Sequence, residues 1–187
     1  MALITLDPNT ALIVVDLQKG IVGLPATHPI GDIIERARAL ADAFRARGLP
    51  VVLVNVAGVA PGRTEQPRPT VPRLEGWTDL IPELDQQPSD ILVTKRSWGA
   101  FASTDLESRL KALGVTEVVI LGVATGTGVE ATARQAYEQG FNVTLAIDAM
   151  TDMRPEAHES SIKNVFPRLG ETGTCRDIAA LLVARNA

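Results

Sequence analysis

The sequence predicts an α/β protein with a doubly wound, mostly parallel six-stranded sheet and helices on both faces, the three-layer arrangement of Rossmann-like folds. Short β-branched runs alternate with helical segments along the chain, the pattern of parallel strands joined by crossover helices. The strand runs are apolar almost throughout, as expected for strands that are covered on both faces. Several helical segments end in glycine just before a strand, and glycine readily adopts the left-handed conformation that closes a helix.

In the amino-terminal half, the first strand is expected at residues 11–15, where five apolar residues follow one another. A helix at residues 31–47 ends at Gly48, directly before the second strand at residues 51–56. Residues 58–77 are irregular and rich in proline and arginine, which indicates a loop over the sheet edge or the active site. The third strand is expected at residues 91–94.

The carboxyl-terminal half repeats the pattern twice. A helix at residues 104–113 ends at Gly114 before a strand at 117–121, and a helix at 128–139 ends at Gly140 before a strand at 142–147. Two further helices are expected at residues 155–165 and 175–185. A weaker pattern at residues 166–169 supplies the sixth strand.

Composition limits the class of protein. The 187 residues, of which 45% are hydrophobic and 21% charged, fit one domain spanning residues 1–187. The net charge of -4 and the lack of a lysine and arginine cluster argue against nucleic acid as a partner. No apolar run is long enough to span a membrane and no signal peptide is visible, so a cytoplasmic location is expected. The single cysteine, Cys175, excludes an intrachain disulfide.

Polar residues stand where the predicted strands end, the edge at which open α/β sheets bind ligands. Asp16 follows the first strand and Lys95 the third. If these strand ends are neighbours, the two side chains can pair, which would keep Asp16 ionised and able to accept a proton. The inert interpretations are a turn residue for Asp16 and a surface charge for Lys95.

The glycine-rich segment at residues 122–134 allows a nucleotide-binding interpretation. Gly126, Gly128 and Ala131 match the G-x-G-x-x-A pattern, and Asp148 lies 22 residues beyond Gly126, near the spacing of a ribose-binding acid. However, residues 123–125 separate the pattern from the strand, three strands precede it, and fewer than 40 residues follow Asp148. No cofactor is therefore expected.

Four stretches together resemble the isochorismatase-like hydrolase superfamily: residues 14–18 (VVDLQ), 94–101 (TKRSWGAF), 122–134 (GVATGTGVEATAR) and 142–151 (NVTLAIDAMT). They come in the family's order, and the resemblance extends over about residues 8–186. It implies a six-stranded parallel sheet, hydrolysis of a small-molecule substrate, and assembly as a homodimer or homotetramer.

The resemblance also implies roles for individual residues. In the cysteine-hydrolase branch, an aspartate at the position of Asp16 deprotonates a cysteine, and a lysine at the position of Lys95 supports the charge. Backbone N–H groups of Ala124 and Gly128 would form an oxyanion hole beside a cis peptide between Val123 and Ala124. The cysteine position is Gly128 here, so the chain has no nucleophile at that point.

Other residues could supply the missing chemistry. Cys175 opens the last predicted helix, far along the chain, and an incidental thiol is the better interpretation. Thr127 would need a nearby base to act as a nucleophile. True isochorismatases also carry glycine in place of the cysteine and hydrolyse a vinyl ether without a covalent intermediate. By that resemblance, Asp16 would donate a proton or orient water, although those enzymes usually have tyrosine at the position of Val123.

Substrate-pocket candidates lie next to these residues: Gln18, Trp98, Phe101, Thr125 and Thr127. The aromatic pair could instead pack in the core or between subunits. The arginines of the long loop could bind a substrate carboxylate or simply keep the loop soluble; they are Arg63, Arg68 and Arg73.

No metal site is expected, because the Asp-x-His ligands of the nicotinamidase branch are missing after Asp16. His28 and His158 are 130 residues apart in the sequence and lack ligand spacing. His158 is expected on a helix surface, and His28 is a minor candidate for lining the site.

The sequence thus predicts a hydrolase that activates water on a small, anionic molecule at an Asp16/Lys95 site without a cysteine nucleophile. A catalytically silent protein that binds a small molecule or a partner protein is the first alternative. A cysteine amidohydrolase whose nucleophile has been replaced is the second.

Overall fold

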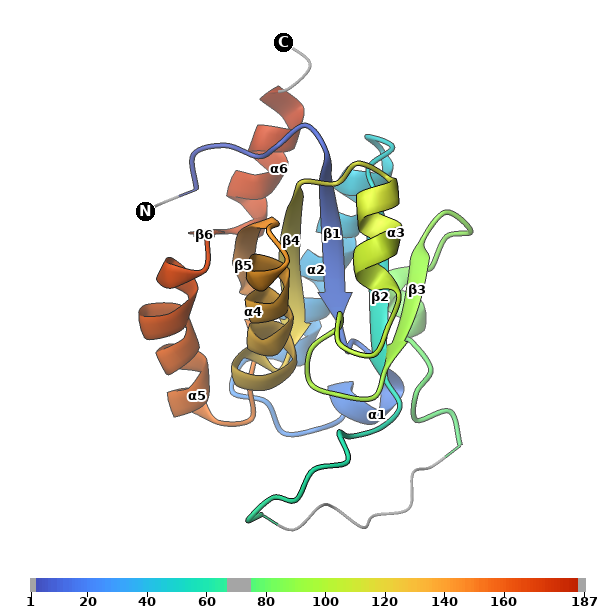
Figure 1. The fold of residues 1–187 in the computed structure, drawn as a ribbon, viewed down its shortest axis with the longest axis vertical. Coiled ribbons are helices and arrows are strands. Elements are labelled where there is room, and N and C mark those ends of the chain that lie inside the picture. Colours follow the sequence, from blue (N-terminus) through green and yellow to red (C-terminus); the bar gives the residue numbers. More distant parts are fainter. Residues whose placement is uncertain (1–2, 67–74, 185–187) are drawn as a thin grey trace.

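Six parallel strands form one sheet in the order β3-β2-β1-β4-β5-β6, which confirms the predicted fold class (Figure 1). The computed structural model describes residues 3–66 and 75–184, so the predicted site residues Arg68 and Arg73 lie outside the described residues. The strands are β1 (Thr10–Val15), β2 (Val51–Val56), β3 (Ile91–Lys95), β4 (Glu117–Val123), β5 (Asn142–Thr151) and β6 (Glu171–Gly173).

Helices connect the strands close to the predicted places. They are α1 (Lys19–Val22), α2 (Ile30–Arg45), α3 (Leu106–Ala112), α4 (Glu130–Glu138), α5 (Pro155–Ser160) and α6 (Cys175–Ala184). A π-helical turn, Thr125–Val129, precedes α4, and another, Ser161–Val165, continues α5.

The predicted position of the sixth strand is wrong. Phe166–Arg168 forms a short 3-10 helix, and β6 follows at Glu171–Gly173. Pro167 has no N–H to donate to a strand ladder, and the Phe166 ring is buried among the apolar side chains under α4. The apolar character of this stretch therefore reflects core packing of a helical turn.

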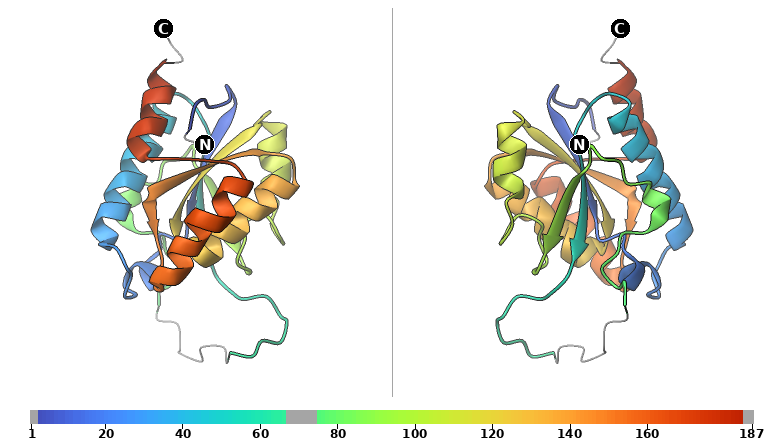
Figure 2. Two further views of the ribbon diagram at one scale, coloured as in Figure 1. Left: turned by 90° about the vertical axis from the view of Figure 1, so that its left-hand side faces the viewer. Right: turned by 90° about the vertical axis from the view of Figure 1, so that its right-hand side faces the viewer.

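The helices divide between the two faces of the sheet (Figure 2). Helices α2 and α6 pack on one face, where Leu40, Phe44 and Ile178 join a buried cluster with the side chains of β1 and β2. Helices α3 and α4 cover the other face, where Leu110 and Ala133 belong to a second cluster. Both faces of the central strands are therefore covered by helices and excluded from water, which explains the apolar sequences of these strands.

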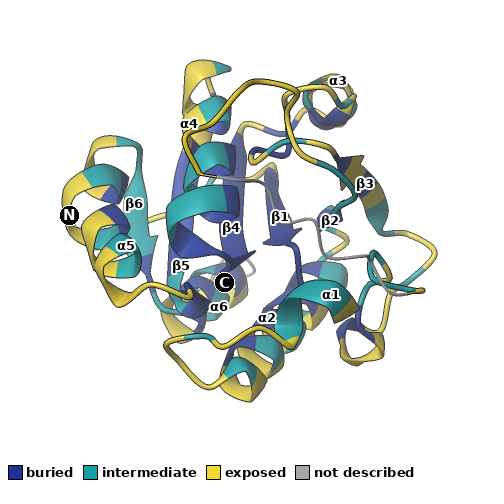
Figure 3. Cartoon of the chain, turned by 90° about the horizontal axis from the view of Figure 1, so that it is seen from below, coloured by how far each residue is buried: buried dark blue, intermediate teal, exposed yellow. Residues whose placement is uncertain are grey.

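The strand order places a topological switch point between β1 and β4. Crossovers leave these two neighbours in opposite directions, so their carboxyl ends border a crevice, the usual ligand position in open α/β sheets. Figure 3 views the molecule from this edge, with the buried ends of β1 and β4 at its centre. The glycine segment follows β4, whereas the dinucleotide fingerprint normally follows the first strand.

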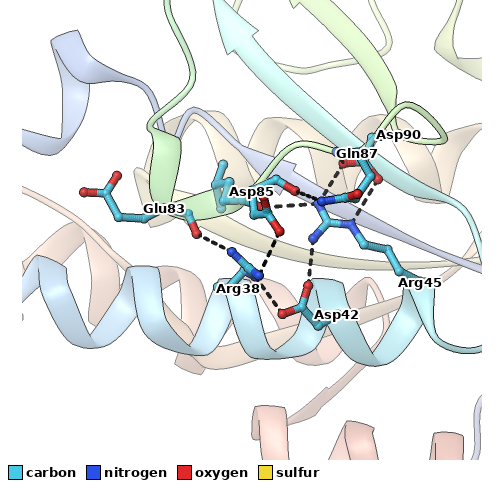
Figure 4. Close-up of polar contacts among 8 residues, drawn as sticks. Arg38, Asp42, Arg45, Glu83, Asp85, Gln87 and Asp90 are labelled. Carbon is cyan, nitrogen blue, oxygen red and sulfur yellow. Dashed lines mark hydrogen bonds and ion pairs between the residues drawn. The ribbon is translucent and has the colours of Figure 1, made fainter.

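An ion-pair network fixes the segment that leads into β3 (Figure 4). On α2, the Arg45 guanidinium contacts Asp90 Oδ2 at 2.7 Å, and the Asp90 side chain is 1% exposed. Arg38, nearer the amino terminus of the same helix, pairs with Asp85 at 3.0 Å, and both side chains are partly exposed. Asp90 directly precedes β3, so this network holds the start of the strand that carries Lys95.

Within residues 3–66 and 75–184, no helix is long and apolar enough to cross a membrane.

Candidate active site

Asp16 occupies the turn at the end of β1. Its φ of +52° lies in the left-handed region, which costs a residue with a side chain about 1–2 kcal/mol. The Asp16 N–H donates to the Val54 carbonyl at 2.9 Å, and the Asp16 carbonyl accepts from the Gln18 N–H at 2.9 Å. The neighbouring strand β4 comes close to β1 here because Gly122 has no side chain. A Cβ at Gly122 would lie 2.1 Å from the Val15 carbonyl oxygen. Two strand ends thus meet beside Asp16.

Lys95 reaches Asp16 from the end of β3. Its Nζ lies 2.7 Å from Asp16 Oδ2 and 3.2 Å from the Ser97 carbonyl oxygen, and the lysine is 1% exposed. The pairing was expected if the ends of β1 and β3 were neighbours. They are not neighbours, because β2 runs between them. The long lysine side chain spans the distance. The second carboxylate oxygen, Asp16 Oδ1, is buried and has no hydrogen-bond partner among the described residues.

Two opposed effects set the protonation of Asp16. Burial raises the pKa of its carboxyl, and the charge and hydrogen bond of Lys95 lower it, with a net rise from 3.8 to about 6. The attraction to Lys95 alone predicts a lowered pKa, but removal of the Asp16 carboxyl from water outweighs it. Asp16 is therefore a carboxylate at neutral pH and becomes protonated in mild acid.

The turn after β4, residues 124–128, forms the other wall of the site and is called the elbow below. The peptide between Val123 and Ala124 is cis. The N–H groups of Thr127 and Val129 both donate to the Ala124 carbonyl at 3.1 Å. A Cβ added at Gly128 would stand 3.1 Å from the Val123 oxygen, 3.1 Å from Val15 Cγ1 and 3.3 Å from Asp16 Oδ2. A side chain at position 128 would thus begin beside the Asp16 carboxylate.

Helix α4 ties the elbow to the loop that follows Lys95. The Thr132 hydroxyl donates to the Gly128 carbonyl at 2.6 Å and accepts from the Ala100 N–H at 3.1 Å. The side-chain oxygen of Gln135 accepts from the N–H groups of Phe101 and Ala102. The elbow and the loop that follows β3 are therefore joined through α4 by hydrogen bonds.

The pocket candidates lie in different surroundings. Gln18 is fully buried, and its side-chain amide donates to the carbonyls of Val56 and Trp77, so it joins the chain after β1 to β2 and the long loop. Phe101 is buried, with its ring centroid 5.8 Å from that of Phe141, which is a core contact.

The remaining candidates differ in exposure. Trp98 is 64% exposed and Thr127 is half-buried, whereas Thr125 is fully buried. Arg63, in the described part of the long loop, is exposed.

The structure brings together two histidines that the sequence separates. The rings of His28 and His158 lie 4.6 Å apart, and His158 Nδ1 is 2.8 Å from the Thr125 hydroxyl of the elbow. His158 was expected on a helix surface, but it is half-buried and faces the elbow. No sequence spacing indicated this contact, because His28 precedes α2 and His158 lies in α5. Within the described residues, no group of three or more histidine, cysteine or acidic side chains is arranged to hold a metal ion.

Cys175 and Asp148 form contacts that support the fold. The Cys175 N–H donates to Asp148 Oδ1 at 2.7 Å, and Arg36 donates to the Asp148 carbonyl. Burial, followed by the nearby charge of Asp148, raises the pKa of the Cys175 thiol far above its ordinary value. The thiol is therefore a poor nucleophile. The Asp148 carboxylate, which was considered for ribose binding, instead accepts a hydrogen bond from the start of α6.

A surface hollow of about 440 Å³ lies at the opposite, amino-terminal edge of the sheet. Its buried carboxylate, Glu117, accepts hydrogen bonds from the hydroxyls of Thr10 and Thr144 at 3.1 and 2.7 Å and from the Asp7 N–H. Because these bonds satisfy both oxygens, we assign Glu117 to the support of the strand ends.

The chain is similar to known proteins in sequence and in fold. The isochorismatase domain family matches residues 10–177. The uncharacterized isochorismatase family protein YecD of Escherichia coli O157:H7 is 39% identical over 177 residues, which cover 91% of this chain and 94% of that protein. The ureidoacrylate amidohydrolase RutB of Stutzerimonas stutzeri is 32% identical over 211 residues, covering 92% and 84%. A solved structure of an isochorismatase family protein from Burkholderia thailandensis has a TM-score of 0.91 at 40% identity and covers 96% of this chain and 98% of its own. The chain belongs to the isochorismatase family of hydrolases.

Proposed function

We propose that this protein hydrolyses a small anionic substrate with a water molecule that Asp16 activates, without a covalent enzyme intermediate. One observation carries the proposal: position 128, where the resemblance to cysteine hydrolases puts a nucleophile, has no side chain and lies beside the buried Asp16–Lys95 pair. The reaction would then use water where the cysteine enzymes use sulfur.

The contacts around Gly128 suit a water molecule. A Cβ at position 128 would lie 3.1 Å from the Val123 carbonyl oxygen and 3.3 Å from Asp16 Oδ2, so a side chain there would leave the backbone toward two acceptors. A water oxygen cannot take the Cβ position itself, which is one bond length from the Gly128 Cα, and we place it further out in the same direction, where the sulfur of a cysteine would lie. There it would donate a hydrogen to the Asp16 carboxylate and turn its lone pairs outward. Such a pose prepares the oxygen to attack.

The protonation of Asp16 fits a general base. With a pKa of about 6, the carboxylate form predominates at neutral pH and its basicity is close to the working pH, which favours proton transfer. Lys95 would stabilise the charge before the proton arrives. The backbone N–H groups of Ala124 and Gly128 are proposed to receive the oxyanion, as the family resemblance implies.

The relatives support the substrate class. The Stutzerimonas stutzeri relative is named for ureidoacrylate, which carries both a C–N bond to hydrolyse and a carboxylate. We therefore place amides and ureido acids first, with Arg63 of the long loop as a candidate contact for the carboxylate.

The raised pKa of Asp16 also favours a second candidate function, hydrolysis of a vinyl ether. In that reaction an acid protonates the enol-ether carbon and water adds afterwards. A carboxyl group with a pKa of about 6 retains its proton in mild acid, where an ordinary aspartic acid has lost it. Asp16 would then be the donor, and the two functions demand opposite protonation states of the same residue.

The pH dependence of kcat/KM separates the two. The experiment measures turnover of amide, ureido-acid and vinyl-ether substrates, isochorismate included, from mildly acidic to neutral pH. If Asp16 is the base, kcat/KM rises as pH increases through about 6; if it is the acid, kcat/KM falls through the same value. Asp16→Asn should lower kcat/KM by roughly 100-fold or more in either case.

Gly128→Ala is the matched test of the water. Its methyl group would stand 3.3 Å from Asp16 Oδ2 and would displace the proposed water while Asp16 and Lys95 stay in place, so hydrolysis should be lost although substrate binding remains. A variant with wild-type activity would contradict the water mechanism. Wild-type protein that binds these molecules without turning any over would instead support a catalytically silent binding protein.

A further inference from the structure

A pair of histidines lies beside the elbow, and one of them is within hydrogen-bonding distance of it. His158 Nδ1 lies 2.8 Å from the Thr125 hydroxyl, and His28 Nδ1 lies 3.1 Å from the hydroxyl of Thr151 at the end of β5. The two rings contact each other with centroids 4.6 Å apart and planes inclined by 53°. Both threonines are fully buried. Each imidazole is therefore anchored at Nδ1 to a rigid part of the sheet or elbow.

The Thr125 contact acts on the proposed oxyanion hole. Thr125 directly follows Ala124, and its backbone begins the π-helical turn Thr125–Val129, which contains Gly128. The next residue is fixed from the same side, because the Gly126 N–H donates to Asp152 Oδ2 at 2.8 Å. Among the side chains that hold the elbow in this way, His158 is the one whose charge can change near neutral pH.

The surroundings of His158 favour its neutral form. Burial lowers the pKa of His158, and the nearby His28 lowers it further, whereas Asp152 and Glu159 raise it. A neutral Nδ1 can accept the Thr125 hydroxyl proton, but an imidazolium has donors only. Protonation would reverse this hydrogen bond, so that Nδ1 donates to the Thr125 hydroxyl, and would place a charge against the His28 ring, so the orientation of the elbow would change.

We propose that His158 is a positioning residue that sets the orientation of the elbow through the Thr125 hydroxyl, with His28 holding the His158 ring. This inference rests on the proposed function, because the elbow matters only if Ala124 and Gly128 receive the reacting oxygen. His158 acts through Thr125 and need not contact the substrate.

Paired substitutions test the hydrogen bond. The amide of asparagine can replace Nδ1, so His158→Asn should keep kcat within about threefold of the wild type, whereas His158→Gln places its amide near Nε2 and should lower kcat by roughly 10–100-fold with little change in KM. Thr125→Ser should likewise retain activity and Thr125→Val should lose it. Lys163→Met, an exposed position on the segment after α5, is the control for general effects on that region.

The pH profile supplies a second readout. In the wild type, both Asp16 and His158 contribute to the acid side of the kcat/KM profile, which should become steeper than one ionisation allows. In His158→Asn one ionisation should remain. Equal losses in the Asn and Gln variants, or wild-type kcat in the Gln variant, would overturn the proposal while leaving the Asp16 mechanism standing.

An NMR titration tests the coupling without turnover. In the wild type, the Gly128 amide signal should shift with the midpoint of the His158 imidazole titration, and in Thr125→Val this shift should disappear. A Gly128 signal that ignores His158 would refute the positioning role. If no substrate is turned over, the proposed function fails, and this measurement still decides whether His158 sets the elbow.

Discussion

At the scale of single residues, two opposed effects act on Asp16: burial raises the pKa of its carboxyl, and Lys95 lowers it. Asp16, Lys95 and Gly128 were identified by their positions at strand ends and by motif resemblance, and the structure places all three together. The direction of the Asp16 pKa shift was not predictable, because it depends on how much water the fold excludes from the carboxyl. The contact of His28 with His158 was equally hidden, since it depends on how the start of α2 and helix α5 are placed.

Removal of Lys95 should move the Asp16 ionisation further from its ordinary value. In Lys95→Met the burial that raises the Asp16 pKa remains, and the charge and hydrogen bond that lower it are gone. We expect the Asp16-dependent limb of kcat/KM to move upward by roughly 1 pH unit or more. Lys111→Met, an exposed lysine paired with Glu107 on α3, should leave the limb in place. A downward shift would mean that Lys95 does not stabilise the carboxylate.

Gly128→Cys should create a cysteine hydrolase site. The new Cβ would meet three atoms at 3.1–3.3 Å, so close packing should cost about 1–3 kcal/mol, but the thiol would emerge beside the Asp16 carboxylate. Amide substrates should then show a burst of covalent intermediate, and iodoacetamide should label the variant faster than the wild type, whose Cys175 thiol is buried. Gly128→Ser is the control with a weaker nucleophile. A labelled variant without any burst would show that the elbow cannot support acyl transfer.

At the scale of elements, apolar periodicity predicted the five main strands and the helices between them. It missed the short α1, which is four residues long and has no fully buried residue, so no helical periodicity can be recognised in it. It also placed the sixth strand too early, because a buried 3-10 turn and a short strand have similar composition. Neither π-helical turn was predictable, since their hydrogen bonds depend on neighbouring elements.

The network on α2 allows a prediction about the segment before β3. Arg45→Met would leave the Asp90 carboxylate buried without its cation, which should lower the free energy of unfolding by about 3–5 kcal/mol. Arg38→Met removes a similar guanidinium from a pair with 36% and 55% exposed side chains, and should cost about 0–1 kcal/mol. Urea unfolding measures both. Equal losses would mean that burial does not determine the strength of these pairs.

At the scale of the whole molecule, the class of fold followed from alternation of strands and helices, and the strand order explains why the site forms. The order decides that β1 and β4 are neighbours and that β2 separates β1 from β3. Local sequence patterns do not determine this order, so they could not show whether the ends of β1 and β3 are adjacent, and β2 in fact runs between them. Proximity of Asp16 and Lys95 therefore depends on side-chain length as well as on topology.

The free energy of unfolding of the whole protein should depend on pH because of the buried Asp16. Its pKa rises from 3.8 to about 6 on folding, so the folded state binds the proton more tightly. The contribution of this carboxyl to stability is fully present below 3.8 and is lost as pH rises through about 6, by roughly 3 kcal/mol in total. Glu117, whose pKa burial also raises, acts in the same direction, whereas His158, whose pKa is lowered, gives stability that increases with pH.

Comparison with Asp16→Asn isolates the effect of the one carboxyl, because the other groups titrate in both proteins. The free energy of unfolding of the wild type minus that of the variant, measured in urea, should decrease as pH rises from about 4 to about 7. Asp177→Asn, at an exposed carboxyl whose pKa is lowered by the Thr174 hydroxyl, should give a difference of the opposite sign over its own range. A wild-type minus Asp16→Asn difference that stayed constant or grew with pH would mean that Lys95, and not burial, governs the carboxyl. Asp16 would then be too weak a base to withdraw a proton from water near neutral pH.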